Sequence, residues 1–141
     1  MKKIIFFLIL LSFGMIYAES FTNTQKFDKN SIRDLSISLK YENLYISNAK
    51  GNEIFITIEA NSQELFPEII IQNDCFAVKT VAGKPSANFL CDVNIFIPGN
   101  YDLNSLLIEN NAGKINIENA SARLIKIKTE GSNNYINLNA D

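Results

Sequence analysis

The chain has 141 residues, of which 47% are hydrophobic and 20% are charged, and it contains neither histidine nor tryptophan. Its 13 Lys and Arg against 15 Asp and Glu give a net charge of −2, without the basic cluster typical of nucleic-acid-binding proteins. The lack of histidine excludes Ser-His-Asp and Cys-His catalysis and most zinc sites. The length suits one modest domain.

The N-terminus has the three parts of a secretory signal peptide. Lysines precede an apolar run over residues 4–11, and Ala18 ends the segment at a small, cleavable residue. The apolar segment is shorter than the roughly 20 residues that span a bilayer, so cleavage is favoured over an uncleaved anchor. Glu19, not cysteine, follows the cut, which disfavours a lipid anchor there. We therefore expect a signal peptide over residues 1–18 and an exported protein, periplasmic or at the cell surface, with 11 basic against 15 acidic residues after cleavage.

Strand patterning begins after a polar segment. Residues 19–33 have no clear period and are expected to form a polar leader or a first edge strand. From residue 34, apolar and polar side chains alternate, as a strand requires when one face meets a core and the other meets water. In the first half the alternation is clearest over residues 54–59, and Pro67 marks a break in it.

The second half repeats a cycle of strand, turn and strand. Ile108 and Ile127 are 19 residues apart, Gly113 and Gly131 are 18 apart, and Ile117 and Leu138 are 21 apart. A spacing near 20 residues is typical of a solenoid, in which each rung stacks on the next. Short strands with regular turns also fit an antiparallel β-sandwich. We expect an all-β, single-domain, β-solenoid-like stack of short strands over residues 34–141, with the antiparallel β-sandwich as the alternative.

The last expected strand keeps its alternation through Ile136 and Leu138. A terminal strand without proline, bulge or lysine leaves backbone N–H and C=O groups available to another chain. We expect this edge to pair with a second copy or a partner strand, the alternative being a frayed last rung.

Asparagine is frequent where turns are expected. It tolerates left-handed backbone angles and forms local hydrogen bonds, which tight corners require. A structural role at corners is therefore favoured over a ligand-binding row of amides. The turn asparagines are Asn48, Asn52, Asn100, Asn110, Asn111, Asn133 and Asn134.

The only two cysteines are Cys75 and Cys91, 16 residues apart. In an oxidising compartment such a pair favours one disulfide, worth roughly 3 kcal/mol where the native geometry permits it. The alternative is two buried free thiols. Two thiols without histidine do not complete a zinc shell, so no metal and no cofactor are expected.

Three aromatic residues, Phe55, Phe96 and Tyr135, alternate out of phase with the core-facing isoleucines. On the outer face they either form a surface for a protein or glycan partner or cover a second core layer. The carboxylates sit singly along the sequence, at positions where solvated charges are favoured over the paired acids of glycoside hydrolases. No catalytic residue is predicted.

Residues 93–98 (VNIFIP), 106–109 (LLIE) and 112–117 (AGKINI) together resemble the adhesin families of bacterial envelope proteins, including head-domain adhesins. In those families an alternating strand ends in proline and glycine-containing turns recur. The resemblance covers most of residues 34–141, although the cysteine-flanked middle is irregular and no obvious cap follows the last strand. It implies an exported, non-catalytic β-repeat domain that binds a protein or glycan partner. The alternatives are a polysaccharide-processing β-helical enzyme and a purely structural envelope protein.

Overall fold

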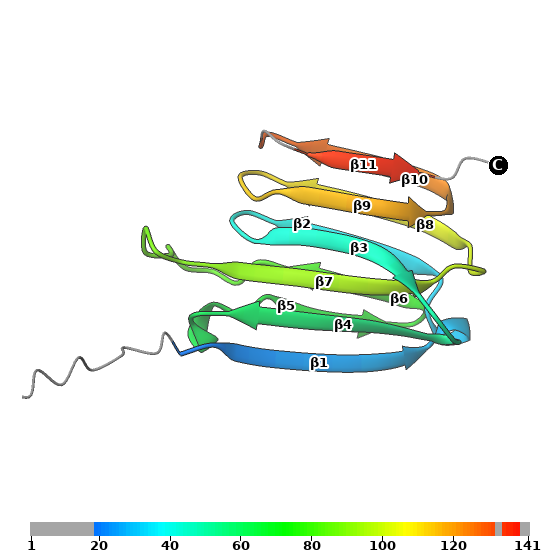
Figure 1. Cartoon of the computed structure of the whole chain (residues 1–141), viewed down its shortest axis with the longest axis horizontal. Helices are drawn as coiled ribbons and strands as arrows, with labels where there is room; N and C mark the ends of the chain where they lie inside the picture. The colour runs from blue at the N-terminus through cyan, green and yellow to red at the C-terminus, as the bar shows by residue number, and fades with distance from the viewer. Residues whose placement is uncertain (1–18, 132–133, 139–141) are drawn as a thin grey trace, which may run out of the picture.

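The computed structural model describes residues 19–131 and 134–138, so the predicted signal peptide lies outside the described residues. Two β-sheets face each other, and short 3-10 turns interrupt two connections (Figure 1). The all-β prediction is confirmed. The elements are β1 Phe21–Asp28, η1 Lys29–Ser31, β2 Asp34–Leu39, β3 Asn43–Ala49, β4 Glu53–Ala60, η2 Gln63–Leu65, β5 Glu68–Gln72, β6 Cys75–Lys79, β7 Cys91–Pro98, β8 Leu103–Asn110, β9 Ile115–Ala120, β10 Ala122–Thr129 and β11 Tyr135–Leu138.

The sheets are built from rungs that pass from one layer to the other. Sheet A has the strand order β1-β4-β7-β3-β9-β11, and sheet B has the order β10-β8-β2-β6-β5. The consecutive pairs β2–β3, β6–β7, β8–β9 and β10–β11 each cross from sheet B to sheet A, and neighbouring rungs are parallel. The β2–β3 rung comes first in the sequence but lies between β6–β7 and β8–β9. Antiparallel strands β1, β4 and β5 complete the other end, so solenoid-like stacking and sandwich-like layering coexist.

The predicted repeat is real: β10 pairs with β8, and β11 with β9, at a spacing of 19 residues, which changes to 18 only at Leu138. Ile108 pairs with Ile127 as predicted. Ile117, however, pairs with Ile136 and not with Leu138, so the predicted spacing of 21 is wrong by two residues. A shift of two keeps every side chain on the same face, which is why alternation alone did not reveal the error.

The core lies between the sheets, and β1 covers it at one end of the stack. Within residues 19–33, Phe21–Asp28 form β1, which is the edge strand of sheet A. Phe27 of β1 packs edge-on against Phe76 at a centroid distance of 5.1 Å and covers that end. At the opposite end, Ile136 aligns with the buried Ile117 yet remains 40% exposed, and a register shift follows Asn137. Pairing of this edge with another chain stays a prediction.

The turns that join the layers carry a buried polar network. Glu42 is 1% exposed, so the expectation that the carboxylates are solvated is wrong for this residue. Its Oε2 accepts hydrogen bonds from the Tyr41 N–H at 3.0 Å and the Thr80 hydroxyl at 2.7 Å. Its backbone carbonyl accepts one from Asn110 Nδ2 at 3.0 Å, and Asn110 Oδ1 accepts one from the Gly113 N–H at 3.1 Å. The predicted corner role of asparagine is confirmed at Asn110.

The expected Cys75–Cys91 disulfide is not formed, and both cysteines are free. Cys75 pairs in register with Asp34 at the start of β2, whereas Cys91 begins β7 beside the start of β3. Because the chain reverses direction between β2 and β3, the start of β2 and the start of β3 lie at opposite ends of the strands. The two cysteines are therefore roughly 16 Å apart along the strand direction. A disulfide needs Cα atoms within about 7 Å, so the loop between the cysteines does not bring them together.

We expect no mass change on reduction of the native protein, and alkylation of Cys75 before Cys91. Burial, with a further contribution from Glu42 and Asp92, raises the pKa of Cys91 to about 12, so almost no thiolate exists at pH 8. Burial also raises the pKa of Cys75, but that side chain is only partly buried. Intact mass after timed iodoacetamide treatment, native and in urea, measures both rates. A mass increase on reduction would show that the Cys75–Cys91 disulfide forms after all.

Candidate functional site

Cross-strand register arranges the outer face of sheet A into rows. Side chains at alternate positions point away from the core, and residues paired across β1, β4, β7 and β3 line up side by side. One row is Lys26, Phe55, Phe96 and Ser47; the next is Thr24, Thr57, Asn94 and Tyr45; the third is Thr22, Glu59, Asp92 and Asn43. The rows place an aromatic pair, short polar side chains and an acidic pair in succession along the strands.

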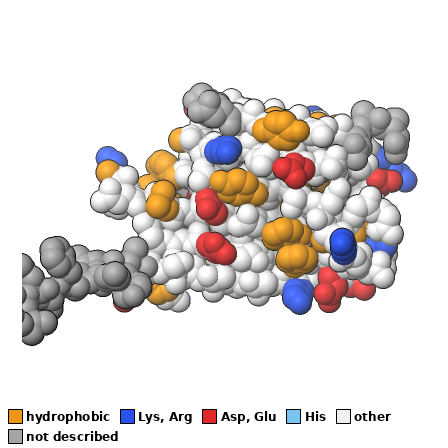
Figure 2. Space-filling view, viewed as in Figure 1, with side chains coloured by type: hydrophobic (Ala, Val, Ile, Leu, Met, Phe, Trp, Pro, Cys, Tyr) orange, Lys and Arg blue, Asp and Glu red, His pale blue; other side chains and the backbone are white. Residues whose placement is uncertain are grey.

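The aromatic row brings together two of the three predicted partner-surface residues. The rings of Phe55 and Phe96 stack at a centroid distance of 4.4 Å with an interplanar angle of 18°. Tyr135 shares the face and is 54% exposed, but β11 is separated from β7 by two strands. Figure 2 views this face and shows its hydrophobic side chains as separate spots between charged ones. No described segment packs over this face as a second layer.

The acidic row was not foreseen from the sequence. Glu59 and Asp92 are 33 residues apart and become direct cross-strand neighbours only because β4 pairs with β7. Asp92 accepts a hydrogen bond from Asn43 Nδ2 at 2.8 Å. Among the described residues, the single ion pair is Lys128–Glu109, so neither Glu59 nor Asp92 has a basic partner there. Like charges directly opposite one another on neighbouring strands repel.

Between these two rows the surface is hollow. The hollow measures about 450 Å³ and is lined by Tyr45, Phe55, Thr57, Glu59, Asp92, Asn94 and Phe96. Thr57 and Asn94 form its floor, and Tyr45 stands at its β3 side. Burial, and then the charge of Asp92, raises the pKa of the Tyr45 phenol, as expected for a ring close to that carboxylate. Tyr45 was missed, although its alternation out of phase with Leu44 and Ile46 is the same signal that identified Phe55.

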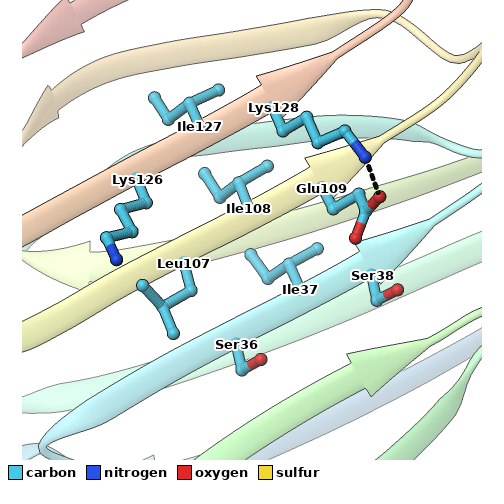
Figure 3. A pocket seen from close by; sticks show the side chains of 9 residues that line it. All are labelled: Ser36, Ile37, Ser38, Leu107, Ile108, Glu109, Lys126, Ile127 and Lys128. Atoms are coloured by element: carbon cyan, nitrogen blue, oxygen red, sulfur yellow. Dashed lines mark hydrogen bonds and ion pairs between the residues drawn. The ribbon is translucent and has the colours of Figure 1, made fainter.

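The outer face of sheet B has a different hollow, of about 280 Å³ (Figure 3). Its floor contains the short side chains of Ser36 and Ser38, and Leu107 borders it. Lys128 Nζ lies 2.9 Å from Glu109 Oε1, so the acid on this face is already paired. Besides the two serines and this ion pair, the only charged side chain that lines the hollow is Lys126.

The described part of the chain, residues 19–131 and 134–138, has no cluster of three or more Cys, Asp or Glu side chains able to hold a metal ion. None of its helices has the length and apolarity to cross a bilayer.

No protein-family model and no curated protein matches the chain. Among solved structures, a putative cell adhesion protein from Clostridium sporogenes is similar, with a TM-score of 0.58 and 14% identity over 85% of this chain and 61% of its own. A putative adhesin from Bacteroides fragilis has a TM-score of 0.43 and 11% identity over 77% of this chain and 58% of its own. A putative lipid binding protein from Parabacteroides distasonis has a TM-score of 0.44 and 10% identity over 75% of this chain and 46% of its own. The chain thus spans less than two thirds of the length of each, and the first likeness shows a shared fold.

Proposed function

We propose that the chain is an exported, non-catalytic, adhesin-like domain that binds a protein or glycan partner through the outer face of sheet A. The observation that carries the proposal is the hollow there, where aromatic, amide and carboxylate side chains converge on one open surface. Partly exposed aromatic side chains next to carboxylates that have no described basic partner are typical of recognition surfaces. The fold shared with a putative cell adhesion protein and the predicted signal peptide support the same role.

The polysaccharide-processing alternative fits this surface less well. Glycoside hydrolases need two carboxyl groups roughly 5–9 Å apart, one of them protonated near neutral pH, usually through burial. Glu59 and Asp92 are neighbours, but Glu59 is exposed and the hollow is open to water. The pair is therefore better suited to holding a charged group than to donating a proton. A purely structural envelope protein would need no such convergence of side chains.

Phe96→Ala is expected to weaken partner binding at least tenfold, equivalent to about 1.4 kcal/mol, because it removes one ring of the stacked pair. The measurement is saturable binding of the fluorescently labelled mature domain to envelope fractions, with unlabelled domain as competitor. Leu107→Ala is the matched control, since Leu107 is 36% exposed on the opposite face. Thermal unfolding checks that both variants fold. Binding that does not saturate, or that Phe96→Ala leaves unchanged, contradicts the proposed face.

A further inference from the structure

One wall of the hollow on sheet A, here called the acidic wall, is formed by Glu59 and Asp92. Glu59 and Asp92 face each other across neighbouring strands, and no described basic side chain pairs with either. Lys114, which belongs to the same face, lies over the ring of Tyr45 with its Nζ 6.0 Å from the centroid. A cation placed between two carboxylates relieves their repulsion and is held by both. The wall therefore favours a positively charged ligand group over a neutral one.

The other wall of the hollow, formed by Phe55 and Phe96, disfavours the binding of a sugar ring. Phe55 and Phe96 are nearly parallel at 4.4 Å, so each ring turns one face to the other. A sugar that stacks on an aromatic surface needs a free ring face, and in this pair one face of each ring is already covered by the other ring. Ring edges suit the aliphatic stem of a long side chain, which packs along apolar surface while its charged end stays in a polar environment.

The strand spacing fits a guanidinium on such a stem. Phe55 and Glu59 are four residues apart on β4, about 13 Å, with Thr57 midway between them. A side chain entering near the phenylalanines crosses the floor and ends at the two carboxylates. A guanidinium binds carboxylates through two parallel N–H groups and stacks on aromatic faces such as Tyr45, whereas an ammonium acts as a point charge.

We infer that the hollow binds an arginine side chain of a partner polypeptide. Glu59 and Asp92 accept hydrogen bonds from the guanidinium, Tyr45 packs against its plane, and Phe55 and Phe96 contact its stem. This assignment rests on the proposed function and specifies the ligand of the same surface. It predicts that added salt weakens binding, because the contact is an exposed ionic one.

The test is a titration of the ¹⁵N-labelled mature domain, followed by amide chemical shifts. The probes are capped Gly-Arg-Gly, Gly-Lys-Gly and Gly-citrulline-Gly peptides and a neutral glucose oligosaccharide. Citrulline has the shape of arginine without its charge. The arginine peptide is expected to shift the amides of Thr57 and Asn94 saturably, the lysine peptide to bind at least threefold more weakly, and the citrulline peptide at least tenfold more weakly.

Two variants separate charge from folding. Glu59→Gln combined with Asp92→Asn keeps the side-chain shapes and is expected to weaken arginine-peptide binding at least tenfold. Glu118→Gln removes one charge from the same face outside the hollow and is expected to leave the affinity within twofold. Both proteins are compared with wild type by thermal unfolding.

The outcomes distinguish this inference from the broader proposal. Equal binding of the citrulline and arginine peptides, or saturable shifts at Thr57 and Asn94 with the oligosaccharide alone, overturns arginine recognition and leaves sheet A as the binding face. Arginine-peptide shifts confined to sheet B overturn both arginine recognition in the hollow and the proposal that sheet A is the binding face. Absence of shifts with every probe overturns the arginine assignment, and the effect of Phe96→Ala on envelope binding then decides the face by itself.

Discussion

Gly113→Ala is expected to destabilise the fold by about 3 kcal/mol, because an added Cβ makes its closest contact here among the described glycines. A Cβ at this position would lie 1.8 Å from the backbone oxygen of Glu42 and 3.0 Å from Asn110 Nδ2. The first contact is with backbone, so it is relieved only if the turn between β8 and β9 moves away from the turn between β2 and β3. Such overpacking costs roughly 1–3 kcal/mol, and loss of the Asn110–Glu42 hydrogen bond adds about 1 kcal/mol.

Gly99→Ala is the matched control for this prediction. A Cβ there meets nothing closer than 3.7 Å, and the residue does not have a left-handed backbone conformation. Urea unfolding monitored by circular dichroism should show a large fall in midpoint for Gly113→Ala and almost none for Gly99→Ala, with similar slopes. Equal midpoints for the two variants would mean that the turns are not held as closely as the structure shows.

Glu42→Ala is expected to cost about 3 kcal/mol through loss of a buried acceptor. The carboxylate receives hydrogen bonds from the Tyr41 N–H and the Thr80 hydroxyl, and a third from the Lys40 N–H at 3.1 Å. Lys40 keeps a second acceptor in Thr80 Oγ1, at 2.9 Å, but the Tyr41 N–H is left without its partner. An unsatisfied buried donor costs roughly 1–3 kcal/mol, and the emptied space adds to that.

The same network joins two rungs, because Thr80 follows β6 and Glu42 lies between β2 and β3. Hydrogen exchange should therefore accelerate first in β6 of the Glu42→Ala protein. Glu42→Gln keeps an acceptor oxygen and is expected to lose less than half as much stability. Glu118→Ala, at an exposed position, should change stability by less than about 0.5 kcal/mol. If the Glu42→Ala and Glu118→Ala proteins are equally stable, the buried carboxylate of Glu42 does not stabilise the fold.

The sequence by itself determined the properties that depend on a few neighbouring residues. Alternation identified the strands and placed Phe55 and Phe96 on an outer face, because side-chain direction in a strand has a period of two. Turn chemistry identified Asn110 as a corner residue. The 19-residue spacing of Ile108 and Ile127 correctly paired β8 with β10, since consecutive rungs of similar length stack in register.

Only the tertiary structure decided which distant segments meet. The β2–β3 rung is inserted between β6–β7 and β8–β9, and this order makes Tyr45 a neighbour of Asn94. The pairing of β4 with β7 joins Glu59 to Asp92 and creates the hollow. Rung direction separates Cys75 from Cys91, and stacking of the turns buries a glutamate that the sequence pattern placed outside. Alternation is compatible with many strand orders and with any register shifted by an even number of residues, so it does not select among them. The packing of both layers around one core makes that selection.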